Sequence, residues 1–289
     1  METTELLKKV RHIEIKAKGL SQNIFAGEYH SAFKGRGMAF AEVREYQYGD
    51  DMRDIDWNVT ARYNKPYVKV FEEERELTVM LLIDVSESLG FGSTSVIKRN
   101  MVAEIAATLA FSAIQNNDKI GVIFFTDKAE KFIPPKKGKK HILFIIREIL
   151  HFQPESNGTD INMVLRYMTN AIKKRCTAFL LSDFIDPDDY KKALQIGNRK
   201  HDVAAIQVYD KLSAELKPIG LMKVRDPETG EERWVDTSSK RVRNDYRTWW
   251  NNRQAEMNNT FRQSGVDNVS VSTEDDYVRA LLQLFQQRK

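Results

Sequence analysis

The chain contains 289 residues, of which 42% are hydrophobic and 30% are charged. This composition is typical of a folded globular protein and excludes collagen-like and low-complexity chains. Because 45 basic residues face 41 acidic ones, the formal charge is only +4, which gives no reason to expect nucleic acid or an anionic membrane as the main partner. The single cysteine, Cys176, excludes an intrachain disulfide and a cysteine-rich zinc site, and it favours a reducing compartment.

The apolar segments are too short for a membrane-spanning helix. The longest, such as residues 79–83, have the length of a strand, whereas a bilayer needs about 20 apolar residues. Residues 1–20 mix charged and apolar positions and lack the continuous apolar segment of a signal peptide. We therefore expect a cytoplasmic protein with no integral membrane segment.

The first part of the chain predicts a short helix followed by a small module rich in β-structure. Residues 4–17 carry apolar side chains at helical spacing, and the stretch after them is rich in Gly and Ser and predicts a loop. Between Phe40 and Glu76, alternating apolar and polar residues predict short strands at both ends of a charged middle. We assign residues 1–76 to this N-terminal part.

From Leu77 the pattern changes to buried strands that alternate with helices. Four continuous apolar runs end in aspartates, at Asp84, Asp127, Asp183 and Asp210. Helical patterns lie between them, at about residues 95–115, 139–151, 160–173 and 187–199. This alternation predicts an α/β domain with a doubly wound, mostly parallel sheet and helices on both faces.

After Asp210 the alternation stops. Residues 221–237 predict a β-hairpin with its turn near residues 227–230, and a polar helix follows at about residues 240–263. A short strand and a final amphipathic helix end the sequence. We assign residues 77–289 to one α/β domain that carries this hairpin as an insertion.

Oxygen-bearing side chains follow two of the predicted strands and precede one helix. Asp84, Ser86 and Ser88 occupy alternate positions after the first strand, Thr159 lies before a helix, and Asp183 ends a later strand. Ligands of such sheets bind at the carboxyl ends of the strands, and carboxylate and hydroxyl oxygens suit Mg²⁺, Mn²⁺ or Ca²⁺ better than zinc. Each residue alone is equally well explained as a helix cap. Asp127 and Asp210 lie outside this set of five, and we interpret them as capping or loop residues.

Taken together, the five residues resemble the metal-ion-dependent adhesion site of von Willebrand factor A-type domains. That pattern is Asp-x-Ser-x-Ser, then a threonine in a second loop, then an aspartate in a third. The resemblance implies a von Willebrand factor A-like fold and a metal bound directly by Ser86, Ser88 and Thr159. It implies that Asp84 and Asp183 act mainly through bound waters, and that an acidic side chain of a partner completes the coordination.

A second resemblance covers the front of the chain. Residues 34–76 are similar to the signature of a bacterial family, domain of unknown function 58, with its core at Tyr48, Gly49, Asp50, Asp51, Arg53, Ile55, Asp56, Trp57, Thr60, Ala61 and Arg62. That family joins such a module to a von Willebrand factor A-like domain and is often encoded beside MoxR-type AAA+ ATPases. The resemblance therefore implies an ATPase of this type as the partner.

The charged segment from Gly49 to Arg62 has two interpretations. Its alternating aspartates and arginines fit an ion-pair network that pins the module to the main sheet, with Trp57 as a packing anchor. They also fit a docking surface for the ATPase.

These observations favour a non-enzymatic protein-interaction module that works in complex assembly, maturation or stress response. No phosphate-binding loop, nucleophile elbow or zinc-type histidine spacing is present in the sequence. The alternative from another class is a metal-dependent phosphoesterase that uses the strand-end carboxylates, although position 86 carries Ser where that chemistry favours a second carboxylate. A third interpretation is a structural scaffold whose site binds no metal.

Overall fold

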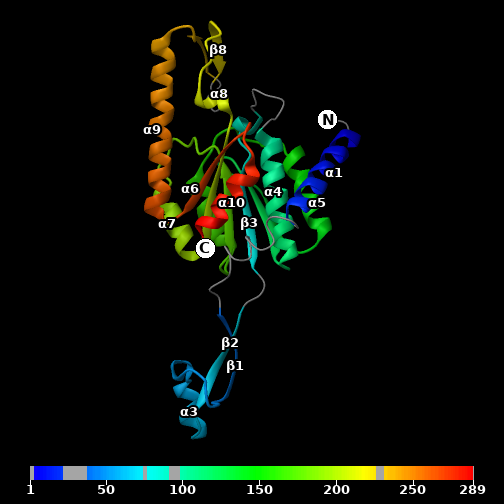
Figure 1. Cartoon of the computed structure of the whole chain (residues 1–289), viewed down its shortest axis with the longest axis vertical. Helices are drawn as coiled ribbons and strands as arrows, with labels where there is room; N and C mark the ends of the chain where they lie inside the picture. The colour runs from blue at the N-terminus through cyan, green and yellow to red at the C-terminus, as the bar shows by residue number, and fades with distance from the viewer. Residues whose placement is uncertain (1–2, 22–37, 74–76, 91–97, 226–230, 289) are drawn as a thin grey trace. The chain divides into compact units, whose positions relative to one another are not determined.

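The computed structural model describes residues 3–21, 38–73, 77–90, 98–225 and 231–288 (Figure 1). The chain forms two compact units. The smaller comprises residues 34–77, and the larger comprises residues 1–33 and 78–289.

The larger unit is built on a six-stranded sheet whose strand order is β10-β7-β6-β3-β4-β5. All neighbouring strands are parallel except the β4–β5 pair at one edge. The strands are β3 (Thr78–Asp84), β4 (Lys119–Phe125), β5 (Ala129–Lys136), β6 (Thr177–Ser182), β7 (Asp202–Tyr209) and β10 (Asp267–Ser272). After β3, the chain adds β4 and β5 on one side of β3. It then crosses to the opposite side of β3 and adds β6, β7 and β10. The strand order therefore reverses between β3 and β6.

Helices cover both faces of this sheet, as the sequence predicts (Figure 1). On one face, Met80 and Leu82 of β3 lie in a buried cluster with residues of α6, α7 and α9. Successive strand residues point to opposite faces, so Leu81 and Ile83 face the other layer, which contains the almost wholly buried α4. The helices of this unit are α1 (Thr3–Leu20), α4 (Lys98–Gln115), α5 (Lys139–His151), α6 (Ile161–Ala171), α7 (Lys191–Lys200), α8 (Lys211–Ala214), α9 (Lys240–Ser264) and α10 (Tyr277–Gln287).

Two details of the sequence prediction change. Strand β5 was not predicted, because it carries Pro134 and Pro135; a strand at the edge of a sheet tolerates proline because its outer N–H groups need no partner. Helix α7 begins at Lys191 rather than near Pro187, because the carboxylates of Asp186 and Asp189 accept backbone N–H groups and hold residues 186–190 in a turn. The predicted start of α4 at residues 95–97 lies outside the described residues.

The N-terminal helix belongs to the larger unit. Val10, Ile13 and Ala17 of α1 are buried, and α1 packs against α4 and α5. The salt bridge between Lys16 and Glu104 of α4 also joins them. The sequence placed this helix with the module that follows it, within residues 1–76. The structure separates the two, because the apolar side of the helix is covered by the helices of the α/β unit.

The smaller unit is an antiparallel pair, β1 (Met38–Glu45) and β2 (Tyr67–Glu73), as the alternating pattern predicts. Its charged middle forms a short 3-10 turn, η2 (Met52–Asp54), and a helix, α3 (Trp57–Tyr63). Asp56 caps this helix by accepting the N–H groups of its first turn, and Asn64 ends it with a left-handed φ of 54°.

Ion pairs in the smaller unit connect its own elements. The guanidinium of Arg44 donates two hydrogen bonds to the carboxylate of Asp50, at 2.7 and 2.8 Å, and holds the pKa of that carboxyl below its usual range. Lys69 of β2 forms a longer ion pair with Asp56, with 3.6 Å between its nitrogen and a carboxylate oxygen. Trp57 is 70% exposed, so it does not anchor the packing of this unit. The segment therefore stabilises its own fold.

The predicted β-hairpin is confirmed. Strands β8 (Leu221–Arg225) and β9 (Glu232–Asp236) pair antiparallel, with Leu221 opposite Asp236. The predicted turn at residues 227–230 lies outside the described residues.

We predict that Gly121→Ala destabilises the protein by about 1–3 kcal/mol. A Cβ atom at this position of β4 would lie 2.9 Å from the backbone of Ile133 and Pro135 and from the sulfur of Met80. Gly19→Ala is the matched control, because no atom of the described residues lies within 4 Å of the Cβ that it adds near the end of α1. Urea unfolding of both variants tests the prediction, and a wild-type free energy of unfolding for Gly121→Ala would contradict it.

Candidate metal centre

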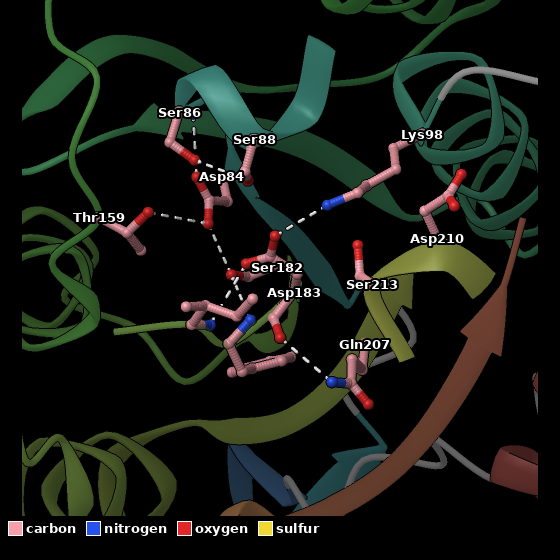
Figure 2. Close-up of polar contacts among 12 residues, drawn as sticks. Asp84, Ser86, Ser88, Lys98, Thr159, Ser182, Asp183, Gln207, Asp210 and Ser213 are labelled. Atoms are coloured by element: carbon pink, nitrogen blue, oxygen red, sulfur yellow. Dashed lines mark hydrogen bonds and ion pairs between the residues drawn. The ribbon is translucent and has the colours of Figure 1, made fainter. Parts of the chain in front are cut away.

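The five predicted residues gather at the point where the strand order reverses. Strands β3 and β6 are neighbours in the middle of the sheet, and they end at Asp84 and Ser182. Connections leave the two strands in opposite directions here, and this is the place where open α/β sheets generally bind ligands. A small cavity lined by Asp84, Ser88 and Asp183 lies at this place. Figure 2 shows the polar side chains at this edge.

The loop after β3 brings three oxygen-bearing side chains together. Asp84 accepts a hydrogen bond from the backbone N–H of Ser86 at 3.0 Å, which turns the chain sharply. The hydroxyl oxygens of Ser86 and Ser88 then lie 3.2 Å apart. Asp84 and Ser86 are buried, whereas Ser88 is partly exposed. The alternate spacing therefore directs these oxygens toward one place.

Thr159 reaches the same place from the loop before α6. The N–H of Asp160 donates to the carbonyl of Thr126, which holds this loop against the end of β4. The carboxylate of Asp160 caps α6. The hydroxyl of Thr159 donates to Oδ2 of Asp84 at 3.4 Å (Figure 2).

Asp183 comes from the loop after β6, and two neighbours fix its position. Its Oδ1 accepts the N–H of Ile185, and its carbonyl accepts a hydrogen bond from Gln207 of β7 at 3.1 Å. Phe184 follows with a left-handed φ of 58°, and its ring packs edge-on against Phe261 at 5.0 Å. Packing of this ring supports an uncommon backbone conformation directly beside the site.

Two further residues of the site were missed from the sequence. Ser182 donates a hydrogen bond of 2.6 Å to Oδ2 of Asp84, and it accepts the N–H of Phe184. Lys98 extends from the start of α4 to Oδ2 of Asp183, with 2.9 Å between nitrogen and oxygen (Figure 2). A signal for Lys98 was present, because it precedes Met101, Val102 and Ile105 on the buried side of the helix, where an unpaired lysine is rarely tolerated.

The two strand-end aspartates outside the five-residue pattern, predicted to be capping or loop residues, have those roles. Asp210 caps α8 by accepting the N–H of Leu212 at 2.8 Å. Asp127 accepts a hydrogen bond from the hydroxyl of Thr126 in the turn between β4 and β5. Neither is one of the five residues that match the adhesion-site pattern.

Comparison with known proteins places the chain in a family. Residues 42–256 match the family model described as "Protein of unknown function DUF58". The chain belongs to this family. The uncharacterized protein Rv1480 of Mycobacterium tuberculosis is 26% identical over 291 residues, which cover 100% of this chain and 92% of that protein. The uncharacterized protein YeaD of Bacillus subtilis is 28% identical over 109 residues, 38% of this chain and 25% of its own length.

This DUF58 protein is similar to solved structures of low sequence identity. An aerotolerance-related membrane protein from Bacteroides fragilis superimposes with a TM-score of 0.52 at 14% identity, covering 73% of this chain and 98% of that one. The VWA domain of SpRpn10 gives a TM-score of 0.41 at 12% identity, with 73% and 94% coverage. The strand order and the antiparallel edge strand confirm the predicted von Willebrand factor A-like fold. Among the described helices of this DUF58 protein, none has the length and apolar character to cross a bilayer.

The donor set suits a hard divalent cation. Two carboxylates and three hydroxyls from three loops converge, and oxygen ligands of this kind are typical of Mg²⁺, Mn²⁺ and Ca²⁺. Within the described ranges, no three His, Cys, Asp or Glu side chains cluster as a metal site, so metal binding here would depend on the hydroxyls. This composition does not suit zinc, which favours nitrogen and sulfur ligands.

The surroundings of Asp84 disfavour the ionised form of its carboxyl. Burial and the nearby charge of Asp183 raise the pKa of Asp84 from its ordinary 3.8 to about 6, although the hydrogen bonds from Ser182 and Ser86 oppose that shift. A carboxyl whose pKa is higher in the folded protein binds its proton more tightly there than in the unfolded chain. Its ionisation therefore costs stability.

We predict that, without metal, the wild type loses stability relative to Asp84→Asn as the pH rises from 3.8 to about 6. Protonated Asp84 favours folding below this window, and the advantage disappears once the carboxyl ionises. The loss amounts to about 3 kcal/mol at most. Urea unfolding of both proteins in chelator, at a series of pH values, measures it. A free-energy difference that stays constant with pH would contradict the prediction.

Proposed function

We propose that this DUF58 protein is a non-enzymatic interaction module that binds an acidic side chain of a partner protein through a divalent cation. Ser86, Ser88 and Thr159 would hold the cation, with Asp84 and Asp183 behind them. The observation that carries this proposal is the convergence of hydroxyl and carboxylate oxygens from three separate loops at the switch point of the sheet.

The residues of the chain each have a distinct part in this function. The three hydroxyls bring oxygen but no charge, so a cation held by them keeps most of its positive charge and can accept a carboxylate oxygen from outside. Ser182 and the N–H of Ser86 orient the carboxylate of Asp84 by donating to its two different oxygens. A partner side chain would approach at the ends of β3 and β6, where sheets of this kind generally bind ligands.

Mg²⁺ is the cation we propose, with Mn²⁺ or Ca²⁺ as substitutes. Mg²⁺ is bound by few protein carboxylates and usually keeps several waters, which a partner carboxylate can replace. A partially exposed Ser88 beside buried Ser86 and Asp84 supports this, because one side of the site stays open to a ligand.

The partner we propose is a MoxR-type AAA+ ATPase in the cytoplasm, acting with this protein in complex assembly, maturation or stress response. The chain belongs to the DUF58 family. The resemblance of its front part to members encoded beside such ATPases supports this choice. Co-purification from the native cell tests it. The expected result is an ATPase that is retained in Mg²⁺, released by chelator and lost with Ser86→Ala.

Phosphoester hydrolysis is the second candidate, and the observation that favours it is Lys98. A buried ammonium group beside two carboxylates could neutralise a bound phosphate. Ser at position 86 opposes it, because the chemistry favours a second carboxylate near the metal. Hydrolysis of p-nitrophenyl phosphate that requires both Mg²⁺ and Asp84 would support this candidate against the first.

We predict that Ser86→Ala and Thr159→Val each weaken Mn²⁺ binding by about tenfold or more, because each removes one oxygen donor. Ser238→Ala and Thr169→Val are the matched controls, since Ser238 is exposed in a turn and the Thr169 hydroxyl bonds the carbonyl of Leu165 within α6. Titration calorimetry measures all five proteins. Equal affinity in the site variants and the controls would reject the metal site.

A further inference from the structure

A buried ion pair lies inside the candidate metal centre. The side chains of Lys98 and Asp183 are only 4% and 3% exposed, and their charged atoms are 2.9 Å apart. Lys98 also lines the same small cavity as Asp84 and Ser88. Its positive charge is therefore part of the site and not of the surface.

Burial of Lys98 costs free energy unless other groups of the site compensate for it. A buried ammonium group loses its hydration, and lysine is almost never fully buried unless it is paired. The carboxylate of Asp183 compensates for this loss, because it lies 2.9 Å from the nitrogen of Lys98. The position of Lys98 is thus explained by the aspartate that follows β6.

The charge of the site follows from these three groups. Asp84 and Asp183 bring two negative charges when both are ionised, and Lys98 brings one positive charge, so one negative charge remains. The hydroxyls of Ser86, Ser88 and Thr159 add none. Affinity for a hard divalent cation depends strongly on the number of charged ligands. A site with one net negative charge binds such a cation weakly, and a carboxylate from another molecule would restore the missing charge.

We propose that Lys98 is an internal counter-cation that lowers the affinity of the free protein for a divalent cation and makes metal binding depend on the partner's carboxylate. This inference rests on the proposed function and assigns it a regulatory residue. By thermodynamic linkage, a carboxylate that strengthens metal binding is itself bound more strongly when metal is present. Metal and partner then associate together, and the free protein stays largely metal-free.

Two substitutions at position 98 separate charge from hydrogen bonding. Lys98→Gln keeps an N–H donor for Asp183 but removes the charge, and we expect it to bind Mn²⁺ about tenfold more tightly or better than the wild type. Lys98→Arg keeps the charge and should match the wild type. Lys16→Gln is the control, because it removes the same charge from a salt bridge to the same helix, outside the site. Titration calorimetry of the free proteins gives the affinities.

Acetate serves as the carboxylate probe in the second measurement. It should strengthen Mn²⁺ binding by the wild type more than by Lys98→Gln. If Lys98→Gln does not stay folded without metal, its melting temperature is followed as Mn²⁺ is added, and a larger rise than in the wild type supports the inference.

The outcomes distinguish the inference from the proposed function. Equal Mn²⁺ affinity in the wild type, Lys98→Gln and Lys98→Arg would overturn the role of Lys98 while the metal site stands. The same holds if Lys98→Gln binds less tightly than the wild type. Absence of Mn²⁺ binding in every protein would overturn the metal site and the inference with it.

Discussion

Two carboxylates held close together at the ends of neighbouring buried strands are the constraint on which the site depends. Asp84 and Asp183 are buried beside each other, and like charges in a poorly hydrated place repel strongly. Three features reduce this repulsion. Ser182 and Ser86 donate hydrogen bonds to Asp84, and the ammonium group of Lys98 pairs with Asp183. The raised pKa of Asp84 also lets this carboxyl stay protonated to a higher pH. A divalent cation would be a fourth. The arrangement is stable as a fold and remains open to a further positive charge.

The sheet explains why this constraint arises here. Parallel strands bring their carboxyl ends to one edge, and the order reverses between β3 and β6, so the loops after them leave in opposite directions. Residues that are distant in sequence meet there, such as Asp84 and Ser182. The same packing that buries β3 and β6 on both faces removes water from the aspartates that end them. The burial that stabilises the core is therefore also the main cause of the raised pKa of Asp84.

Much of the fold follows from local patterns. Runs such as residues 79–83 and 178–181 are long enough for strands and apolar throughout, and the helices between them repeat with a helical period. Where prediction failed, a contact distant in sequence decided. Strand β5 is stabilised by its place at an edge, which makes Pro134 and Pro135 tolerable. Helix α1 belongs to the α/β unit because α4 and α5 cover its apolar residues. In neither case does the local sequence carry that information.

The sequence by itself determined the α/β class and the hairpin insertion, because each depends on periodicity along the chain. Its resemblance to von Willebrand factor A-type domains indicated the finer fold and the five oxygen-bearing residues that meet at the site. Only the tertiary structure decided the charge of that site. Lys98 and Asp183 are 85 residues apart, and their pairing exists because α4 begins beside the end of β6. A charge acts through space, over distances of a few ångströms, so its neighbours are known only once the chain has folded.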